Sequence, residues 1–253
     1  MTVYVIGAGP GAADLLTLRG AALLGRCEVC LYAGSLVPSE MLSHCAPGTE
    51  MIDTRQMLLD DIVATIARAH REGKDVARLH SGDPSLYSAV AEQYRRLSAL
   101  GIAVEIVPGV PAFAAAAAAL DTELTVPSVG QSLLITRVST LSTDMPPGES
   151  LAELARTGVT LALHLAAHQA EQIVHALVPL YGLECPTATV AFASRPNQQI
   201  VRSPLGELAG ALTAAGIVRT AVIFVGKVLA AEDFQDSYLY STARMTKLRE
   251  EGR

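Results

Sequence analysis

The chain has 253 residues, of which 50% are hydrophobic and 17% charged, so its length suits one large or two small domains. The composition excludes a disordered chain and a fibrous protein, and four irregularly spaced cysteines are too few for a disulfide scaffold. The formal net charge of −6 disfavours the extended basic surface with which proteins bind duplex nucleic acid.

The chain carries no sign of a membrane span or a secretion signal. No apolar run reaches the roughly 18 to 20 residues that cross a bilayer. The first residues, MTVYVIGAGPG, lack the basic segment that opens a signal peptide. We therefore expect a soluble protein of the reducing cytoplasm.

The first hundred residues alternate short β-prone runs with helical patterns. The expected strands are residues 2–6, 28–32, 76–80 and 104–107, and the expected helices are residues 15–24, 59–71 and 86–100. This alternation predicts a parallel sheet, because only a crossover helix returns the chain to the same end of the sheet.

A second series of elements follows a Pro- and Gly-rich boundary near residues 108–111. It begins with an alanine-rich helix at residues 112–120. The later strands are expected at residues 132–136, 160–165, 189–193 and 221–225, and the helices at 167–178 and 205–215. Residues 138–149 form the longest expected loop.

The predicted fold is therefore α/β with two domains, each a mostly parallel or mixed sheet flanked by helices. We place the first domain at residues 1–110 and the second at 111–240. Residues 241–253 are expected to be a frayed tail, because the end of the chain is polar and charged.

A glycine turn follows the first expected strand. Gly7, Gly9 and Ala12 match the G-x-G-x-x-G/A pattern of dinucleotide-binding proteins. However, Pro10 removes one N–H donor, and Ala33 stands near the place where a ribose-binding acid is needed. The turn could bind a dinucleotide, pack a helix on a strand, or line a site for another ligand.

A second candidate loop, His80-Ser-Gly-Asp-Pro84, ends the third expected strand. Ligands of open α/β sheets bind at the carboxyl ends of strands, so the loop is well placed for a site. Asp83 also fits the N-cap of the next helix, with Pro84 at its first position. The two interpretations are compatible, since backbone groups of Ser81 and Gly82 could contact a ligand while Asp83 caps.

The sequence predicts no metal site. Cys27 and Cys30 form a C-x-x-C pair, but on a strand residues three apart point to opposite faces. His164 and His168 lack the glutamate of an H-E-x-x-H motif. No G-x-S-x-G elbow or G-x-x-x-x-G-K-[ST] loop supports a hydrolase or a nucleoside triphosphatase.

Four segments taken together resemble the tetrapyrrole (corrin and porphyrin) methyltransferases. They are VIGAGPG, LYAGSLV, RLHSGDPSLY and VPGVPAFAAAAAALDTELTVP, and the resemblance covers about residues 1–240. The AGSLV and FAAAAAAL strings are most similar to the branch that methylates carbon 11 of precorrin-4 in cobalamin (vitamin B12) biosynthesis. The resemblance implies a protein that is usually a homodimer, with S-adenosylmethionine held between two α/β domains.

The resemblance also implies which residues contact the ligands. Most cofactor contacts are small or apolar, as expected where backbone groups hold adenine and methionine closely. They are Pro10, Ser81, Gly82, Asp83, Leu86, Pro111, Ala112, Leu165, Ala193 and Ala221. The expected substrate contacts are Ser35, His80, Arg137 and Arg195.

The chain departs from its relatives in places that matter for chemistry. Related uroporphyrinogen-III methyltransferases carry a proposed basic aspartate after the tyrosine of the second strand, but this chain has Ala33, so no catalytic base is inherited. Thr140 and Leu141 stand where carbon-11 enzymes tend to have Gly and Arg. The substrate bears eight carboxylates, and the cations considered for them are Arg55, Arg137, Arg195 and Lys227.

The expected reaction is in-line attack of a ring carbon on the sulfonium methyl group, giving precorrin-5 and S-adenosylhomocysteine without a covalent enzyme intermediate. The closest alternatives are methylation at another ring position or of cobalt-precorrin-4. More distant ones are a ribosomal RNA methylase, an NAD-binding oxidoreductase, and a tetrapyrrole carrier without activity.

Overall fold

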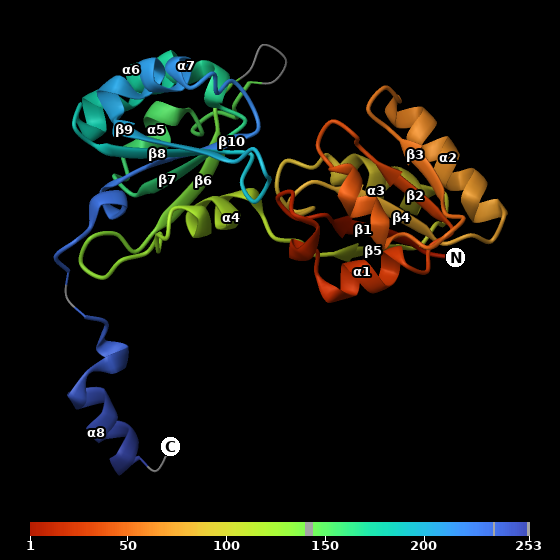
Figure 1. The fold of residues 1–253 in the computed structure, drawn as a ribbon, viewed down its shortest axis with the longest axis horizontal. Coiled ribbons are helices and arrows are strands. Elements are labelled where there is room, and N and C mark those ends of the chain that lie inside the picture. The colour runs from red at the N-terminus through yellow and green to blue at the C-terminus, as the bar shows by residue number, and fades with distance from the viewer. Residues whose placement is uncertain (140–143, 235, 252–253) are drawn as a thin grey trace. The chain divides into compact units, whose positions relative to one another are not determined.

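The computed structural model describes residues 1–139, 144–234 and 236–251, and it divides the chain into two units (Figure 1). The first unit comprises Met1–Ala115 together with Phe192–Gln198, and the second comprises Ala116–Ala191 and Gln199–Arg253. None of the helices in the described ranges is long and apolar enough to cross a membrane. The predicted α/β fold with two sheets is confirmed.

The first unit contains a five-stranded sheet in the order β3-β2-β4-β1-β5. All its strand pairs are parallel. The strands are β1 (Val3–Gly7), β2 (Val29–Tyr32), β3 (Glu50–Asp53), β4 (Val76–His80) and β5 (Val104–Val107). Because they are parallel, their carboxyl ends, and the loops that carry the candidate residues, lie at one edge of the sheet.

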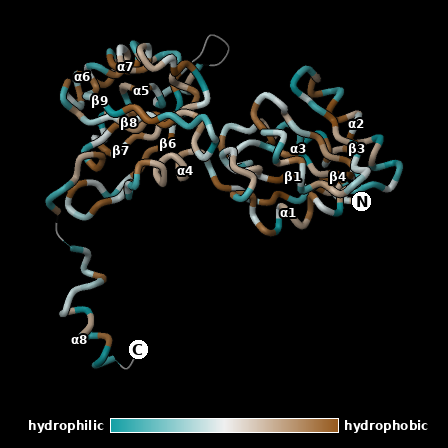
Figure 2. The backbone as a smooth tube through the Cα atoms, viewed as in Figure 1, coloured by the Kyte–Doolittle hydropathy of each residue, from teal (hydrophilic) through white to brown (hydrophobic). Residues whose placement is uncertain are grey.

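Helices cover both faces of this sheet. Helix α1 (Leu18–Leu24) packs in one apolar cluster with Ile6 and Leu79. Helices α2 (Leu59–Arg71) and α3 (Val90–Ala99) pack in a second cluster with Val5 and Leu31. Figure 2 shows hydrophobic residues along these strands. Successive side chains of a strand therefore pack into the apolar clusters on opposite faces of the sheet. Each fully buried Leu or Ile side chain stabilises the unit by about 1.5 to 3 kcal/mol.

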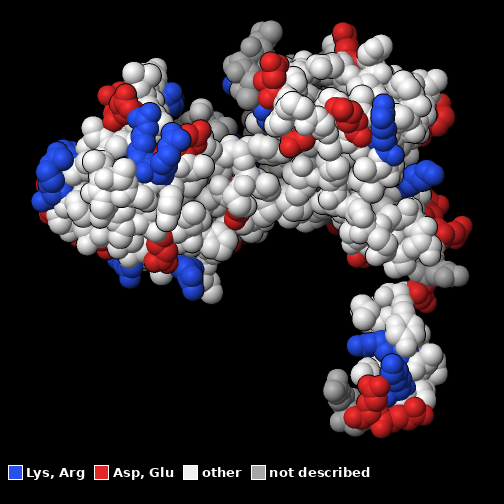
Figure 3. All heavy atoms as spheres, turned by 180° about the vertical axis from the view of Figure 1, so that it is seen from behind, with Lys and Arg blue, Asp and Glu red and all other residues white. Residues whose placement is uncertain are grey.

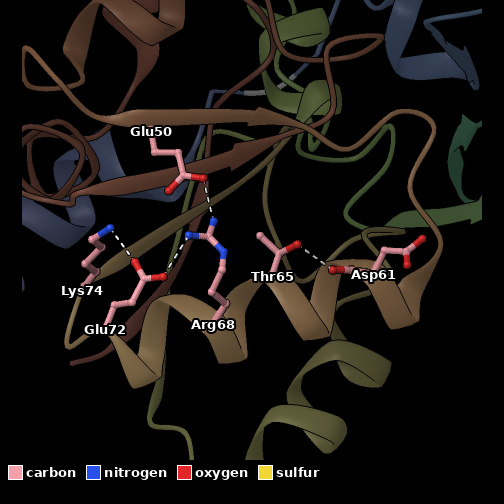
Figure 4. A network of polar contacts seen from close by, with 6 residues as sticks. All are labelled: Glu50, Asp61, Thr65, Arg68, Glu72 and Lys74. Carbon is pink, nitrogen blue, oxygen red and sulfur yellow. Dashed lines mark hydrogen bonds and ion pairs between the residues drawn. The ribbon is translucent and has the colours of Figure 1, made fainter.

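Strand β3 was not predicted from the sequence, because its four residues, EMID, have an acid at each end and few β-prone side chains. A charged network joins it to α2 (Figure 4). Arg68 donates to Glu50 over 2.6 Å and to Glu72 over 3.2 Å, and Lys74 donates to Glu72 over 2.6 Å. Charges along an edge strand also discourage pairing with another chain.

Helix α3 begins at Val90, so the prediction of a helix from residue 86 capped by Asp83 is wrong. Tyr87 and Ala89 have positive φ angles of 53° and 50°, a conformation that no right-handed helix contains. The carboxylate of Asp83 binds other backbone groups, which are described below.

The second unit contains a mixed sheet in the order β6-β7-β10-β8-β9, in which only β6 and β7 are parallel. The strands are β6 (Leu133–Arg137), β7 (Thr160–His164), β8 (Pro186–Ala191), β9 (Gln199–Pro204) and β10 (Ala221–Val225). The helices are α5 (Leu151–Ala155), α6 (Ala170–Tyr181), α7 (Leu208–Ala214) and α8 (Thr242–Glu250). The expected alanine helix is α4 (Ala112–Ala119), and the division between the two units falls within it.

Strand β9 and helix α5 of this unit were not predicted from the sequence. Strand β9 is a polar edge strand with a weak hydrophobic pattern. Helix α5 has only five residues, which is too short for a clear helical pattern. Its capping box, Ser150 with Glu153, could have indicated the start of the helix. Residues 241–253, expected to fray, include helix α8, which has no buried residue. Thr140 and Leu141, where a cation was expected to be missing, lie outside the described residues.

The face of the molecule drawn in Figure 3 carries Lys and Arg side chains interspersed with Asp and Glu side chains and separated by uncharged surface. This face shows no continuous basic stripe of the kind that tracks a nucleic acid backbone.

Candidate active site

The glycine turn after β1 is hydrogen-bonded to the loop after β4. The N–H of Ala8 donates to the carbonyl of His80 over 2.7 Å. Gly9 and Gly82 exchange two hydrogen bonds, of 3.1 and 2.7 Å. The two loops that the sequence singled out are therefore one continuous backbone surface at the carboxyl edge of the first sheet.

The loop after β5 packs against the same surface without side chains between the backbones. A Cβ atom on Gly7 would lie 2.6 Å from Cα of Gly109 and 2.8 Å from the carbonyl oxygen of Gly82. The backbones of Pro111 and Ala112 pass about 4 Å from where a Cβ atom of Gly82 would stand, because Pro111 Cα is 3.9 Å and Ala112 N is 3.7 Å from that position. The structure thus brings the predicted cofactor contacts from three loops together.

Asp83 joins the loops after β4 and β5. Its Oδ2 accepts the N–H of Gly109 over 2.8 Å, and its Oδ1 accepts the N–H of Ser85 over 2.8 Å and the Ser85 hydroxyl. Burial alone would raise the pKa of Asp83, but the hydrogen bonds from Ser85 and Gly109 outweigh it and lower the pKa below its ordinary value. The carboxylate is thus an ionised support for the backbone turn rather than a helix cap.

The glycine turn has few N–H groups left for a diphosphate. Ala8 and Gly9 donate to the β4 loop, Pro10 has no N–H, and Ala12 donates to the Ser194 hydroxyl over 3.0 Å. A dinucleotide turn needs these groups to face its ligand. The geometry therefore argues against the NAD-binding alternative.

Arg195, predicted as a substrate contact, packs over the same turn. A Cβ atom on Gly11 would lie 2.5 Å from its Cγ, and its Nη2 donates to the carbonyl of Leu36 over 2.7 Å. Burial lowers the pKa of Arg195 below its ordinary value. The side chain is thus engaged with two loops of the first unit. Ala193, a predicted cofactor contact, lies in the same segment, Phe192–Gln198.

Two buried polar side chains lie on one face of β4. Arg78 donates to Gln93 and to Thr54, each over 3.1 Å, and burial lowers its pKa to about 10. Burial, with a smaller contribution from Arg78, lowers the pKa of His80 to about 3. Among the described residues, Nε2 of His80 has no hydrogen-bond partner, so a neutral imidazole nitrogen is left unsatisfied at the end of β4.

The Ala33-Gly34-Ser35 turn after β2 is held by Asp53, which sequence reasoning missed together with β3. Oδ1 of Asp53 accepts the N–H groups of Gly34 and Arg55, each over 3.0 Å. Oδ2 accepts Nε of Arg55 over 2.6 Å and pairs with its Nη2 over 2.5 Å. Hydrogen bonds from the Arg55 and Gly34 backbones, then from the Arg55 side chain, lower the pKa of Asp53. Ser35, a predicted substrate contact, is exposed beside this cluster.

Three predicted residues share one edge of the second sheet. Arg137 and His164 are register partners at the ends of β6 and β7, and Val222 pairs with His164 in β10. Leu165 and Ala221 therefore lie next to each other at this edge. Leu165 has a φ of +54° and is 58% exposed, which is unusual for a large apolar residue.

A cavity of about 400 Å³ lies at the opposite edge of the second sheet and includes none of the predicted cofactor contacts. Its lining includes Gly130, Thr160, Tyr181, Cys185 and Lys227. Lys227 follows the carboxyl end of β10, which is antiparallel to β7. This cation is thus separated from Leu165 by the length of the strands.

The cysteines and histidines show no metal-binding arrangement in the described parts of the chain. Cys27 precedes β2, and Cys27 and Cys30 belong to the same apolar cluster, so the expectation that they face opposite sides of a strand is wrong. Irregular backbone before β2 turns Cys27 to the face that Cys30 occupies. Both thiols are free, and desolvation by burial is the main reason that the pKa of Cys27 is raised to about 12.

The comparisons with known proteins agree with this geometry. The family described as Tetrapyrrole (Corrin/Porphyrin) Methylases matches residues 2–209. This chain belongs to the tetrapyrrole methylase family. The precorrin-4 C(11)-methyltransferase of Mycobacterium tuberculosis is 62% identical to it over 96% of this chain and 98% of that protein.

Two solved structures extend the comparison of this tetrapyrrole methylase. A cobalt precorrin-4 methyltransferase has a TM-score of 0.88 at 38% identity, covering 90% of this chain and 95% of that one. A uroporphyrin-III C-methyl transferase from Thermus thermophilus, complexed with S-adenyl homocysteine, has a TM-score of 0.75 at 28% identity, covering 92% and 96%.

The buried histidines of this methylase predict a pH dependence of stability. Burial lowers the pKa of His80 to about 3 and of His164 to about 4, from an ordinary 6.5. The unfolded chain protonates both below about pH 6.5. The stability present above that pH is therefore lost as the pH falls toward the folded values, by up to about 1.4 kcal/mol per group and pH unit.

We expect the thermal midpoint to decrease as the pH is lowered from about 6.5 to about 5, a range in which most carboxylates do not yet titrate. The variant carrying both His80→Gln and His164→Gln should show a flatter profile over this window. An equally steep fall in the variant and the parent protein would contradict the assignment to these two side chains.

Proposed function

We propose that this protein is an S-adenosylmethionine-dependent methyltransferase that methylates carbon 11 of precorrin-4, giving precorrin-5 and S-adenosylhomocysteine in cobalamin biosynthesis. The observation that carries the proposal is the 62% identity, over nearly the whole of both chains, to the mycobacterial enzyme named for this reaction. The backbone-lined surface at the carboxyl edge of the first sheet supports it.

The residues of this surface fit a bound nucleoside with an amino-acid tail. Gly82 has a φ of +67°, and the space of its missing Cβ is bounded by backbone atoms of Pro111 and Ala112. Small residues let backbone N–H and C=O groups approach a ligand closely. We assign Pro10, Ser81, Gly82, Pro111 and Ala112 to this contact surface, and S-adenosylmethionine would supply a methyl group already activated on a sulfonium centre.

The chain's own residues act mainly by positioning. Asp83 fixes the Gly82 and Gly109 loops relative to each other, so the ligand would meet a preformed surface. Holding two reacting atoms in line can supply about 7 to 11 kcal/mol of the barrier reduction. No nucleophilic side chain is needed, and water or a substrate carboxylate could accept the proton that leaves the ring.

Other parts of the assignment stay predictions. They are cofactor contacts by Asp83, Leu86, Leu165, Ala193 and Ala221, and substrate contacts by Ser35, His80, Arg137 and Arg195. A homodimer, a cytoplasmic location and independence of a metal ion also stay predictions.

The substrate is proposed to be metal-free precorrin-4 rather than its cobalt complex. Identity to the mycobacterial protein named for precorrin-4 is 62%, whereas identity to the structure named for cobalt precorrin-4 is 38%. Cobalt-precorrin-4 is thus the second candidate.

The test is an anaerobic assay with methyl-labelled S-adenosylmethionine and either precorrin-4 or cobalt-precorrin-4. We expect label in the tetrapyrrole, stoichiometric S-adenosylhomocysteine, and a higher kcat/KM with the metal-free substrate. Binding of both ligands without transfer would favour a carrier instead. Transfer to a different ring carbon, located by NMR of a carbon-13 methyl product, would overturn the carbon-11 assignment.

A further inference from the structure

Asp53 and Arg55 form a fixed cluster at the carboxyl edge of the first sheet, beside the turn that follows β2. Asp53 is the register partner of Tyr32, which places its carboxylate next to Ala33 and Gly34. A Cβ atom on Gly34 would lie 2.5 Å from Oδ2 of Asp53 and 3.2 Å from Nη2 of Arg55. A larger residue at position 34 would have to displace the Asp53 carboxylate, and the Arg55 guanidinium lies next to the turn.

The Asp53 carboxylate is saturated by protein donors. Its two oxygens accept the N–H groups of Gly34 and Arg55 and the side chain of Arg55, at 2.5 to 3.0 Å. A carboxylate with four such donors has no lone pair well placed for a substrate proton. Asp53 therefore orders its neighbours and does not stand in for the base that is absent at Ala33.

Arg55 keeps one edge of its guanidinium open. Nε and Nη2 face Asp53, which uses the side-on edge. The end-on edge consists of Nη1 and the second hydrogen of Nη2, and in the described part of the structure Nη1 has no hydrogen-bond partner. The side chain is 58% exposed. This edge is a planar two-donor fork of the kind that binds a carboxylate with two hydrogen bonds.

The other cations that the sequence offered are placed differently. Arg195 packs on Gly11 and donates to Leu36. Arg137 donates to the carbonyls of Val138 and Asp144, each over 3.3 Å. Lys227 lines the cavity at the far edge of the second sheet.

Arg55 lies at a suitable distance from the proposed cofactor surface. All five strands of the first sheet are parallel, so Arg55 shares an edge with Gly82. β3 is separated from β4 by β2, which is two strand spacings or about 10 Å. A macrocycle with carboxylate arms spans that distance while its ring stays near the methyl donor.

We propose that Arg55 binds a carboxylate side chain of the tetrapyrrole through Nη1 and Nη2, and that Asp53 is the positioning residue that holds the guanidinium and the Gly34 turn for this contact. The proposal rests on the proposed function, since it assigns the substrate contact of that same site. Arg55 differs from the other three cations because its Nη1 and Nη2 edge is exposed to solvent at the carboxyl edge of the first sheet.

The test compares Arg55→Gln, Arg55→Lys, Asp53→Asn and the double variant of Asp53→Asn with Arg55→Gln. The matched control is Arg71→Gln, which removes the same charge from the exposed end of α2, at the opposite edge of the sheet. The measurements are KM and kcat for precorrin-4, S-adenosylhomocysteine affinity by calorimetry, and thermal midpoint. Uroporphyrin I, a stable tetrapyrrole with eight carboxylates, serves as a binding probe that needs no turnover.

We expect Arg55→Gln to raise KM and the dissociation constant of the probe about tenfold, with kcat within about twofold and cofactor affinity unchanged. Arg55→Lys should be intermediate, because an ammonium keeps the charge but not the fork. Asp53→Asn should raise KM in the same direction, and the double variant should add little to Arg55→Gln, since Asp53 acts through Arg55.

An Arg55→Gln protein with KM and probe affinity within about twofold of the parent would overturn the proposal, as would an equal effect of Arg71→Gln. A parent protein that fails to methylate either precorrin-4 form refutes the proposed function instead. The probe titration then still decides whether Arg55 binds a tetrapyrrole carboxylate.

Discussion

Replacing Gly109 with alanine is expected to destabilise the first unit by about 3 kcal/mol and to weaken S-adenosylhomocysteine binding at least about tenfold. A Cβ atom at this position would lie 2.7 Å from Cα of Gly7, beside the carbonyl oxygen of Gly82. These are backbone atoms of β1 and of the β4 loop, so no side-chain rotation relieves the contact. Thermal denaturation and calorimetry with S-adenosylhomocysteine measure the two effects.

Gly210→Ala is the matched control. Gly210 lies inside α7, and nothing stands within 4 Å of the position of its Cβ. Alanine should leave ligand binding unchanged and stabilise the helix by about 0.5 to 1 kcal/mol. A Gly109→Ala protein that melts and binds like its parent would show that the three loops do not depend on the absence of a side chain.

Replacing Asp83 with alanine is expected to cost about 2 kcal/mol of stability, because the N–H groups of Gly109 and Ser85 lose a charged acceptor. The Gly82 turn would no longer be tied to the β5 loop. We therefore expect S-adenosylhomocysteine affinity to fall about tenfold or more, with a parallel loss in kcat/KM. Calorimetry and steady-state kinetics report the two losses.

The Asp83 contribution also has a defined pH dependence. Its pKa is lowered in the folded protein, so the stabilisation is fully present above the unfolded value of about 3.9 and is lost as the pH falls through the folded value. Asp60→Ala is the control, because the Asp60 side chain is 84% exposed and pairs with Arg96 on the surface. If both variants lose cofactor affinity equally, Asp83 has no particular role in the site.

Residues with strong local signals could be placed in the fold from the sequence. Strands β4 and β5 and helix α2 have the predicted boundaries, because apolar periodicity and terminal glycines mark them. Strands β3 and β9 were missed because their sequences are rich in polar residues and their side chains are largely exposed, which leaves little apolar alternation. The family resemblance rested on glycine and proline loops, whose backbone geometry tolerates few substitutions.

The sequence predicted the loop residues of the candidate site but not the side-chain hydrogen bonds that hold those loops in place. Ser81, Gly82, Pro111 and Ala112 were singled out, and the structure brings their backbones together. The sequence also allowed Asp83 to cap a helix, because Asp-Pro precedes a helical pattern, but its carboxylate binds Ser85 and Gly109 instead, and Gly109 is 26 residues away. The contact of Asp53 with Gly34 could not be predicted from the sequence either, because it depends on the pairing of β2 with β3, which no short sequence pattern encodes.

Local residue chemistry was enough to predict the α/β alternation and the tight loops at strand ends, since each follows from propensities and turns within a few neighbouring positions. The family came instead from the resemblance of four sequence segments to known proteins. The tertiary structure was needed to determine the strand order and the hydrogen-bond partners of Asp53 and Asp83. It also showed that Arg195 donates to Leu36 and that Arg55 keeps one edge of its guanidinium exposed. Hydrogen bonds between distant residues depend on which backbones meet at the sheet edge, and that meeting is a property of the folded chain as a whole.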